Sequence, residues 1–310
     1  MLYFIVNEKS KSGNAKQIWK EIEEVLKVRN VSYQAFVSEY RGHAGKLAAE
    51  ICAMDDNDIC LVAVGGDGTA NEVINGITDF EKVRFGVIPT GSGNDLARGL
   101  SLSKDPKNGA IHILNAMKKS REDTWCMDLG EVNFGEKKRL FAISAGIGLD
   151  ALVCKKALKS TIKDILNKIR LGKLTYLVLT VQSLFTMQTA DAEIFFDREE
   201  GLQKKRMIFT AAMNFKAEGG GVPMAPAASA CDGELSFCEA AGIPKWRTFL
   251  CLPFLVAAKH TSIHGFSVTD AKDCTIRLSR PMVVHADGEY CGEVTEVHFH
   301  CLPGKLRVLK

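Results

Sequence analysis

Glycine-rich turns with polar side chains follow several predicted strands, and one of these turns could bind a phosphate. Residues 64–72 read VGGDGTANE and come directly after the apolar run 59–64. Glycines leave the backbone open to a bulky anion, and residues 69–76 predict a helix whose free N–H groups would face that anion. Asp67 is unexpected here, because a carboxylate repels phosphate unless a metal ion or a set of hydrogen-bond donors intervenes.

Two further turns carry polar side chains at the ends of apolar runs. Residues 88–98 read IPTGSGNDLAR, whose glycines and hydroxyls offer donors for a phosphate or a ribose. Residues 285–289 read HADGE, so one carboxylate could accept a proton from an alcohol while the other orients it or binds a metal. Each turn has a simpler alternative. The first could be a plain capped turn and the second a solvated hairpin, since Asp-Gly is the commonest hairpin signal.

A fourth group of residues could hold a metal ion. It runs from Asn214 through the triple glycine 219–221 to Asp232. Three successive glycines weaken any regular element that contains them, so they indicate a special turn. Asp232 with nearby backbone carbonyls would suit a hard divalent ion, and an Asx turn is the simpler alternative.

Two histidine pairs and one glycine pattern are weaker signals. His260 and His264 lie four residues apart on a predicted helix, and His298 and His300 share one face of a predicted strand. The sequence places no third ligand near either pair, so a structural role is favoured for both. Residues 146–151 fit the dinucleotide pattern GxGxxA, but a lysine-rich helix follows them, so close packing at a strand–helix turn is the better account.

The elements that must position these turns follow from hydrophobic periodicity. Strands are predicted at 2–7, 31–37, 59–64 and 85–89, and helices at 16–27, 43–54 and 69–76. This alternation predicts a parallel sheet whose ligands bind at the carboxyl ends of the strands. Further strands are predicted at 128–133, 139–144, 191–196, 207–213, 235–239, 266–269, 275–278, 282–286, 294–300 and 306–309, with helical patterns at 151–184 and 245–259. The second part is therefore mostly β, and the boundary is placed near residue 125.

The composition is that of an ordinary globular protein. The 310 residues suit two domains, with a hydrophobic fraction of 46% and a charged fraction of 25%. A net charge of +3 is too small to indicate nucleic acid, so no such partner is expected. Ten scattered cysteines without a CxxC pair indicate free thiols in a reducing cytosol. No apolar run approaches the roughly 18 residues of a spanning helix.

Together the motifs resemble the diacylglycerol kinase catalytic domain family, which includes soluble bacterial lipid kinases and sphingosine kinases. The resemblance rests on GGDGT at 65–69, Asn71-Glu72, Asn75-Gly76, GSGND at 91–95, Ala97-Arg98, DLG at 128–130, Gly146, Asp150, the block from Asn214 to Gly233, and DGE at 287–289. GGDGT alone is shared with NAD kinases. The resemblance implies an α/β ATP-binding domain at 1–125, completed by 302–310, a β-sandwich lipid-substrate domain at 126–301, and an ATP site in the cleft between them.

The same resemblance implies roles for individual residues. ATP would be bound by Asn7, Lys11, Ser12, Ser38, Gly65, Gly66, Asp67, Gly68, Thr69, Ala70, Asn71, Glu72, Ser92 and Asn94. Asp287 and Glu289 would form the acid–base pair. The resemblance does not say which of the two accepts the proton. Ser229, Asp232 and Glu234 would hold Mg²⁺, and Asp67 would belong to a water and Mg²⁺ network beside the phosphates. The chain departs from the family at two points: no proline follows Asn7, and Ser38 replaces a usual threonine.

Basic residues gather in one predicted amphipathic helix, Lys155–Lys173. Such a helix can bind an anionic membrane surface, although a core-packed helix with a solvated basic face explains the pattern as well. The sequence as a whole predicts a cytoplasmic, ATP- and Mg²⁺-dependent lipid kinase with diacylglycerol as the favoured acceptor. Peripheral contact with the inner membrane face and a homodimer stay open. The alternatives are a kinase of another lipid such as a sphingoid base, an NAD kinase-type enzyme, and a nucleotide or lipid sensor.

Overall fold

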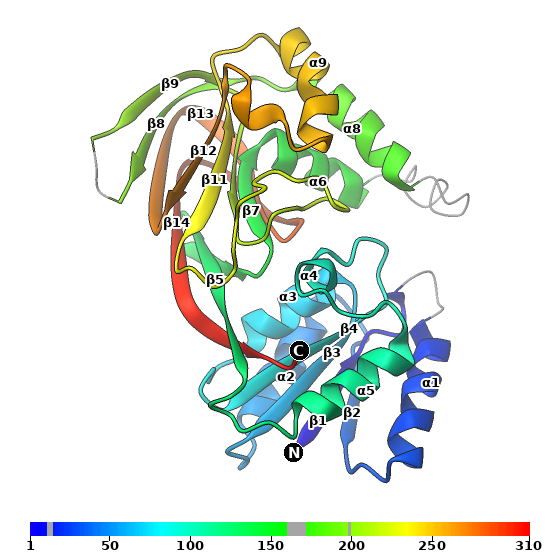
Figure 1. Cartoon of the computed structure of the whole chain (residues 1–310). Coiled ribbons are helices and arrows are strands. Elements are labelled where there is room, and N and C mark those ends of the chain that lie inside the picture. Colours follow the sequence, from blue (N-terminus) through cyan, green and yellow to red (C-terminus); the bar gives the residue numbers. More distant parts are fainter. Residues whose placement is uncertain (11–14, 160–171, 198–199) are drawn as a thin grey trace. The chain divides into compact units, whose positions relative to one another are not determined.

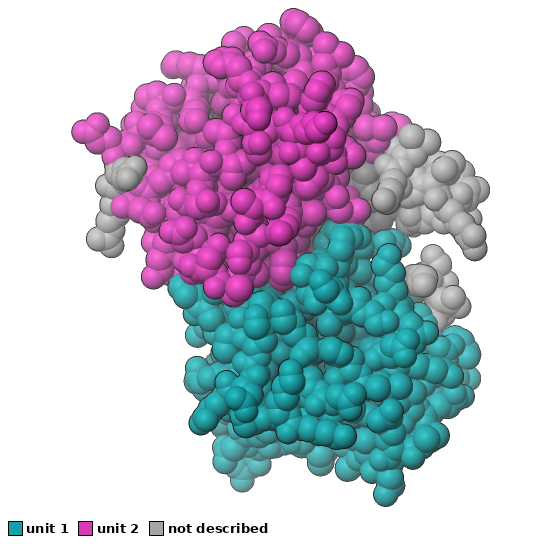
Figure 2. Space-filling model, in the orientation of Figure 1, with its two compact units in different colours: residues 1–128, 303–310 teal, residues 129–302 magenta. Residues whose placement is uncertain are grey.

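The computed structural model describes residues 1–10, 15–159, 172–197 and 200–310. They form two compact units, one of residues 1–128 with 303–310 and one of residues 129–302 (Figure 2). We call them unit 1 and unit 2. The sequence predicts the division after residue 125 and the return at residue 302. Two predicted ATP residues, Lys11 and Ser12, lie outside the described residues. For most of the predicted basic helix Lys155–Lys173, either the residue or its side chain is not described.

Unit 1 is built on a parallel sheet. Its strands β1 (Leu2–Val6), β2 (Gln34–Val37), β3 (Ile59–Gly65) and β4 (Val83–Pro89) lie in the order β4-β3-β1-β2. Every residue of β1, β3 and β4 is buried, as expected of parallel strands covered on both faces. The far end of β14 (Glu289–Val308) adds a further parallel strand, because Arg307 and Val308 pair with Arg84 and Phe85 of β4.

Helices cover both faces of this sheet (Figure 1). They are α1 (Ala15–Val28), α2 (His43–Cys52), α3 (Asp67–Gly76), α4 (Asp95–Gly99) and α5 (Pro106–Ala116). α1 and α5 pack on one face, where Trp19, Ile22 and Ile113 join the apolar side chains of the strands. α5 was not predicted. Its start nevertheless carries a sequence signal, since Asp105 accepts a hydrogen bond from the Asn108 N–H (2.8 Å) before Pro106 in the first turn.

Unit 2 is mostly antiparallel sheet. Its strands are β5 (Trp125–Phe134), β6 (Lys137–Phe141), β7 (Ser144–Gly148), β8 (Ala190–Phe196), β9 (Leu202–Met207), β10 (Phe209–Met213), β11 (Leu235–Ala240), β12 (Phe266–Ala271), β13 (Asp273–Ala286) and β14. The path β12-β11-β10-β7-β13-β14 is continuous, with β8 and β9 attached to β13, and β5 and β6 attached to β14. Helices α6 (Leu149–Lys159), α8 (Gly172–Thr186) and α9 (Lys245–Val256) complete the unit with a short turn of helix, η2 (His260–Ser262). The predicted fold class, α/β followed by a β-rich domain, is confirmed.

Four predicted strands of unit 2 differ in detail from the structure. The strand predicted at 139–144 is the end of β6 and the start of β7. The strand predicted at 207–213 is β10 with the last residue of β9, and the rest of β9 was not predicted. The strands predicted at 275–278 and 282–286 are one, β13, with a register shift between Arg277 and Met282. β7 was missed because its small residues have low β-propensity. Only glycine fits at position 146, because a Cβ on this residue would collide with Asp150 Oδ2 at 1.8 Å. This close approach arises only in the folded unit.

Candidate functional site

The turn after β3 meets the turn after β4. β3 ends at Gly65, Gly66 precedes the first residue of α3, and the Thr90 N–H donates to the carbonyl of Gly65 (2.8 Å). The two backbones are so close that a Cβ on Gly91 would lie 2.7 Å from the Cα of Gly66. The GGDGT and GSGND segments therefore form one glycine-lined surface at the carboxyl ends of two parallel strands, beside the N-terminus of α3.

Hydrogen-bond donors explain the carboxylate of Asp67. Its Oδ2 accepts from the N–H of Asp95 (3.0 Å), and its Oδ1 accepts from the N–H of Leu96 (3.1 Å). Burial raises the pKa of Asp67, while the N–H of Leu96 and the charge of Arg98 act in the opposite direction. Asp67 therefore links the turn after β3 to the start of α4. Its predicted place in a Mg²⁺ network stays a prediction.

The other predicted ATP residues that the structure describes lie around these turns. Asn7, after β1, donates from Nδ2 to Thr69 Oγ1 (3.0 Å). Asn94 adopts a left-handed conformation (φ 53°), and its side-chain amide bonds both the N–H and the carbonyl of Gly91 (2.9 Å each). Glu72 Oε1 accepts from the N–H of Gly42 (2.8 Å). Gly68, Ala70 and Asn71 belong to the first turns of α3, Ser38 is buried just after β2, and Ser92 is exposed in the turn after β4.

Asp287 occupies the tight turn between the two longest strands. β13 ends at Ala286 and β14 begins at Glu289, so Asp287 and Gly288 form a two-residue hairpin loop with positive φ (47° and 80°). This is the hairpin that the sequence left open as the simpler alternative. Asp287 Oδ2 accepts from the N–H of Ala142 (2.9 Å), and Asp287 Oδ1 accepts from the N–H groups of Ile143 (2.8 Å) and Ser144 (3.1 Å). The backbone thus fixes the direction of this carboxylate.

The segment that holds Asp287 is itself held by Asn214. The Asn214 side chain donates from Nδ2 to the carbonyl of Ala142 (2.9 Å), and its N–H donates to the carbonyl of Ile143 (2.9 Å). The N–H of Asp287 in turn donates to the carbonyl of Ser144 (2.8 Å). Two segments far from Asp287 in the sequence, 142–144 and Asn214, therefore support its carboxylate. Glu289, on the other side of the hairpin turn, is half-buried at the start of β14.

A buried group of charges lies next to this hairpin. His285 Nε2 is 3.0 Å from Asp150 Oδ2, and the Gly288 N–H donates to His285 Nδ1 (3.2 Å). Glu218 contacts the hydroxyl of Ser144, and its carboxylate lies with Asp150 and His285 in one cluster whose ligand-type atoms are within 4.8 Å of one another. His285 is thus a link between the turn of Asp287 and two carboxylates.

The environment shifts the pKa values of two members of this cluster. Burial raises the pKa of Glu218. Burial alone would lower the pKa of His285, but the hydrogen bond and charge of Asp150, with the charges of Glu218 and Asp287, raise it. Both groups therefore bind protons more tightly in the folded protein than in the unfolded chain, where their pKa values are about 4.3 and 6.5.

We expect unit 2 to lose stability as the pH rises. A group whose folded pKa is raised contributes stability below its unfolded pKa and loses that contribution as the pH rises through the folded value. The Tm of the wild-type protein should therefore fall more steeply between pH 5 and pH 8 than the Tm of Glu218→Gln, which keeps a polar side chain beside Ser144. Thermal unfolding followed by circular dichroism across this range measures both slopes. Equal slopes would contradict the assignment of this pH dependence to Glu218.

The predicted magnesium ligands lie on the loop before β11. Asp232 and Glu234 are exposed, and Asp232 Oδ1 accepts from the N–H of Glu234 (3.2 Å). This contact confirms the Asx turn. The hydroxyl of Ser229 lies 3.4 Å from the Cys231 sulfur. All three predicted ligands offer oxygen atoms, which is the donor type that Mg²⁺ prefers, and their shared site stays a prediction.

Sequence reasoning missed Glu218 and residues 142–144. Glu218 directly precedes the three glycines 219–221, and its N–H and carbonyl both bond Val222 across that turn. The triple glycine was therefore a usable signal for the buried carboxylate before it. Residues 142–144 act through their backbone N–H groups, so their side chains gave no indication of this role.

Two lysines of the predicted basic helix make contacts within unit 2. Lys155 Nζ pairs with Glu293 and lies 5.0 Å from the centroid of the Tyr290 ring, and Lys156 Nζ donates to Thr186 Oγ1 (3.1 Å). Both side chains are partly buried. The remaining basic residues of Lys155–Lys173 have no described side chains, so the membrane-binding role of this helix stays a prediction.

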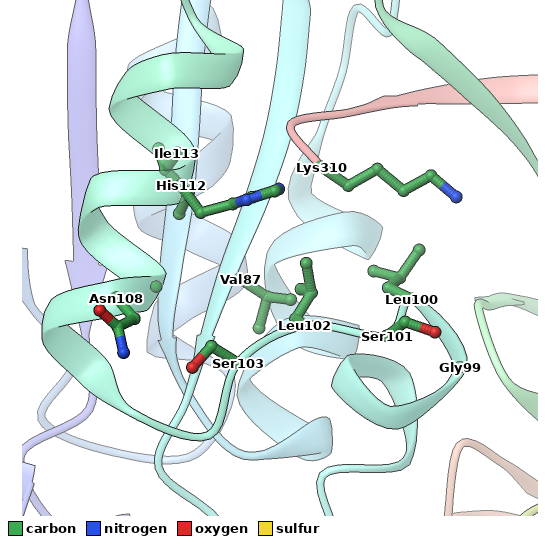
Figure 3. A pocket seen from close by; sticks show the side chains of 11 residues that line it. Val87, Gly99, Leu100, Ser101, Leu102, Ser103, Asn108, His112, Ile113 and Lys310 are labelled. Atoms are coloured by element: carbon green, nitrogen blue, oxygen red, sulfur yellow. The ribbon is translucent and has the colours of Figure 1, made fainter.

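Unit 1 contains a cavity of about 470 Å³. It is lined by Val87 of β4, by the segment after α4 and by α5, with Lys310 at its edge (Figure 3). None of the predicted site residues contributes to its described lining. Within the part of the chain that the structure describes, no helix combines the length and the hydropathy needed to cross a membrane.

Comparison with known proteins gives concordant results. The diacylglycerol kinase catalytic domain matches residues 1–127, and the YegS C-terminal NAD kinase beta sandwich-like domain matches residues 144–310. A Bacillus subtilis protein named "Putative lipid kinase YtlR" is 30% identical, over 99% of this chain and 98% of that protein. A diacylglycerol kinase of the same organism is 28% identical, over 79% of this chain and 75% of that protein.

Solved structures share the fold. A diacylglycerol kinase from Bacillus anthracis superposes with a TM-score of 0.72 at 19% identity, covering 99% of this chain and 96% of that one. An NAD kinase from Archaeoglobus fulgidus in complex with ATP superposes with a TM-score of 0.55 at 14% identity, covering 100% of this chain and 94% of that one. At these identities the structures are similar to this chain in fold alone.

Proposed function

The chain belongs to the diacylglycerol kinase catalytic domain family, and we propose on that basis that it transfers the γ-phosphate of ATP to a lipid hydroxyl. Diacylglycerol is the proposed acceptor and phosphatidic acid the product. The observation that carries the proposal is the carboxylate of Asp287, which three backbone N–H groups hold in a left-handed hairpin turn. A carboxylate fixed in direction suits a general base for an alcohol.

The proposed reaction divides the work between the two units. Asp287 takes the proton of the lipid hydroxyl as the new oxygen–phosphorus bond forms, and the bond from the γ-phosphorus to the bridging oxygen breaks to release ADP. Glu289 is the second member of the pair. In unit 1, the glycine surface formed by residues 65–69 and 91–94 binds the phosphates through backbone N–H groups.

Magnesium is proposed as the metal of this enzyme. Ser229, Asp232 and Glu234 are the residues that would hold it, because they supply a hydroxyl and two carboxylates on one exposed loop. When bound, the ion supplies positive charge that offsets the charge of the phosphates.

A phosphate-transfer assay with a panel of acceptors tests the proposal. The purified full chain is incubated with radiolabelled ATP, Mg²⁺ and separate micelles of diacylglycerol, monoacylglycerol or sphingosine, and with NAD in solution. We expect label in phosphatidic acid. Label only in a sphingoid base or in NAD would replace the proposed acceptor, and ATP binding without transfer to any acceptor would favour a sensor and overturn the kinase.

We further propose that the kinase works in the cytoplasm at the inner membrane face and meets the bilayer through α8 and α9. Large apolar side chains stand exposed on these two helices: Leu177, Val178, Phe185, Trp246, Phe249, Leu250, Phe254 and Val256. The helices lie next to each other (Figure 1). The ring centroids of Phe185 and Phe249 are 6.0 Å apart. Exposed apolar side chains in this number are unfavourable in water, and a bilayer is the partner that fits a lipid kinase.

Removing two apolar side chains from α9 should weaken vesicle binding. Trp246 and Leu250 are 60% and 57% exposed, so changing both to Ser removes apolar surface without opening the core. We expect a loss of about tenfold in the partition onto phosphatidylglycerol vesicles containing diacylglycerol, measured by co-sedimentation. Val28→Ser is the matched control, because Val28 is 87% exposed at the end of α1 in unit 1. An unchanged partition for the double variant would exclude α9 as the docking surface.

A further inference from the structure

We propose that Asp273, His298 and His300 form a Zn²⁺ site on the outer face of β13 and β14. This site is independent of the kinase reaction. The sequence contains the histidine pair His298 and His300, and strand pairing supplies the third ligand, Asp273, from a strand 25 residues earlier in the chain.

The register of the two strands brings these residues together. Asp273 pairs with His300, and Thr275 pairs with His298, so the four side chains occupy two neighbouring rows on one face. The alternate residues of the same strands, including Cys274, Ile276 and Phe299, are fully buried on the other face. The core therefore fixes the register, and a slip by one residue would bury the histidines.

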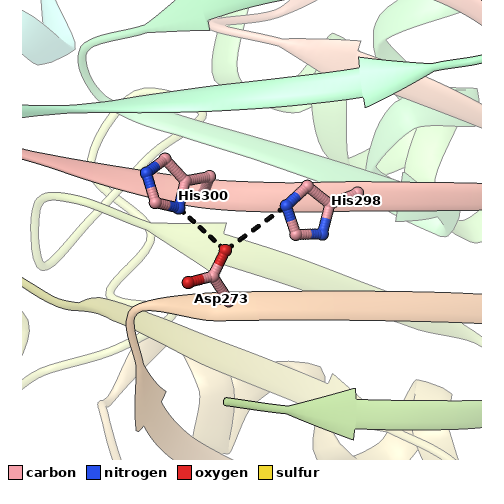
Figure 4. Close-up of side chains that lie close together, drawn as sticks. All are labelled: Asp273, His298 and His300. Atoms are coloured by element: carbon pink, nitrogen blue, oxygen red, sulfur yellow. Dashed lines mark hydrogen bonds and ion pairs between the residues drawn. The ribbon is translucent and has the colours of Figure 1, made fainter. Parts of the chain in front are cut away.

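The distances suit a small divalent ion. Asp273 Oδ1 lies 2.8 Å from His300 Nδ1 and 3.3 Å from His298 Nε2, and the three ligand-type atoms all fall within 4.8 Å of one another (Figure 4). A tetrahedral zinc ion with bonds of about 2.0–2.2 Å separates its ligands by roughly 3.3–3.5 Å. Small side-chain rotations bring these atoms to that spacing, because all three side chains are only partly buried.

A second contact orients one of the histidines. The other ring nitrogen of His298, Nδ1, lies 3.0 Å from the hydroxyl of Thr275. If Nδ1 carries the proton and donates it to this hydroxyl, the lone pair of Nε2 faces Asp273 and the ion. Histidines that bind zinc generally have such a hydrogen-bond partner on their second nitrogen.

The ligand types select zinc over magnesium. Imidazole nitrogen suits Zn²⁺, whereas Mg²⁺ is held by oxygen, so this site is distinct from the proposed Mg²⁺ loop around Asp232. In the part of the chain that the structure describes, both ion pairs of Asp273 go to the two histidines, while Arg277 in the next row pairs with Glu296. The carboxylate is therefore available to an ion that replaces ring protons. Three protein ligands leave a fourth position for water.

The site would fasten the end of the β13–β14 pair opposite the hairpin turn. Asp273 is the first residue of β13, and Asp287 follows its last residue. Zinc at this place would stabilise unit 2 without touching the proposed base. Binding should raise the Tm of the protein and leave kcat in excess Mg²⁺ unchanged.

Zinc titration of the metal-free full chain tests the site. We expect one equivalent of Zn²⁺ by calorimetry, a rise in Tm of about 5 °C with zinc at 100 times its Kd, and visible Co²⁺ absorption typical of low coordination. His298→Gln, His300→Gln and Asp273→Asn should each weaken binding by at least about tenfold, an expectation set by the loss of one of three ligands. His112→Gln, an exposed histidine of α5, is the control and should bind normally.

Two results would overturn the proposal. One is zinc binding that survives in all three ligand variants, which would place the ion elsewhere, for example among Asp150, Glu218 and His285. The other is the absence of saturable binding in the wild-type protein, which would leave the cluster as a row of cross-strand ion pairs. Circular dichroism of each variant ensures that weaker binding is not a loss of folding.

Discussion

Changing Asp287 to Asn will lower kcat by about 10³-fold or more, the range expected when a general base is lost, while ATP binding to the protein persists. The change also has a structural cost. Three N–H groups point at the Asp287 carboxylate, and the NH₂ of an asparagine would meet at least one of them as a second donor. The local segment 142–144 should therefore loosen, so the kinetic loss must be separated from a loss of stability.

Asp197→Asn is the matched control for this experiment. Asp197 also has a left-handed φ (46°), lies in unit 2, and accepts backbone N–H groups from Lys272 (3.0 Å) and Asp273 (2.8 Å). We expect a smaller fall in Tm for Asp197→Asn, because Oδ1 of Asp197 accepts both N–H groups and an asparagine keeps that oxygen. A fall in kcat is expected for Asp287→Asn alone. Steady-state kinetics, thermal unfolding and nucleotide binding by calorimetry provide the three readings. If Asp287→Asn keeps more than about a tenth of the wild-type kcat, Asp287 is not the base.

Changing Asp67 to Ala will raise KM for ATP and lower kcat/KM by about 10²-fold, because misplacing a binding group by about 1 Å can cost that much. The structural reason is the pair of hydrogen bonds from Asp95 and Leu96, which ties the turn after β3 to the start of α4. Without the carboxylate, both N–H groups lose their partner and the surface formed with Gly91 opens. The protein should remain folded, with a stability loss of about 1–3 kcal/mol.

Asp105→Ala controls for the loss of a capping carboxylate in unit 1. Asp105 accepts one backbone N–H at the start of α5, away from the glycine turns. We expect it to lower Tm without changing KM for ATP. The same KM in Asp67→Ala and wild type would show that the turn does not need Asp67 to bind the nucleotide.

Sequence periodicity was enough to predict the parallel strands of unit 1 and its first three helices, but not α5. Parallel strands that are buried on both faces have continuous apolar runs. The GGDGT and GSGND turns come at the carboxyl ends of two such runs, β3 and β4. The contact between Gly66 and Gly91 follows from that arrangement, since neighbouring strands bring their ends together. The role of Asp67 in tying the turn after β3 to α4 could not be predicted, because it depends on N–H groups at the start of α4.

The support of the proposed base could not be predicted from sequence for a different reason. Asp287 is held by residues about 145 positions earlier in the chain, and they act through main-chain atoms that every sequence possesses. Glu218 and Asp150 similarly reach His285 only through the antiparallel pairing of β7 and β13. Predicting the three proposed zinc ligands would likewise have required the pairing of two strands. His298 and His300 were visible as a pair, and the register of β13 supplies Asp273.

The path of β14 has a consequence for the order in which the protein is made. Unit 1 needs residues 303–310, with the Leu309 N–H donating to Phe85 (2.8 Å) and its buried side chain joining the core that contains Trp19. A ribosome completes these residues only after all of unit 2, roughly 10 to 35 s after residue 128. During that interval the edge of β4 lacks its neighbour and is open to other chains. The first unit to emerge is therefore the last that can finish folding.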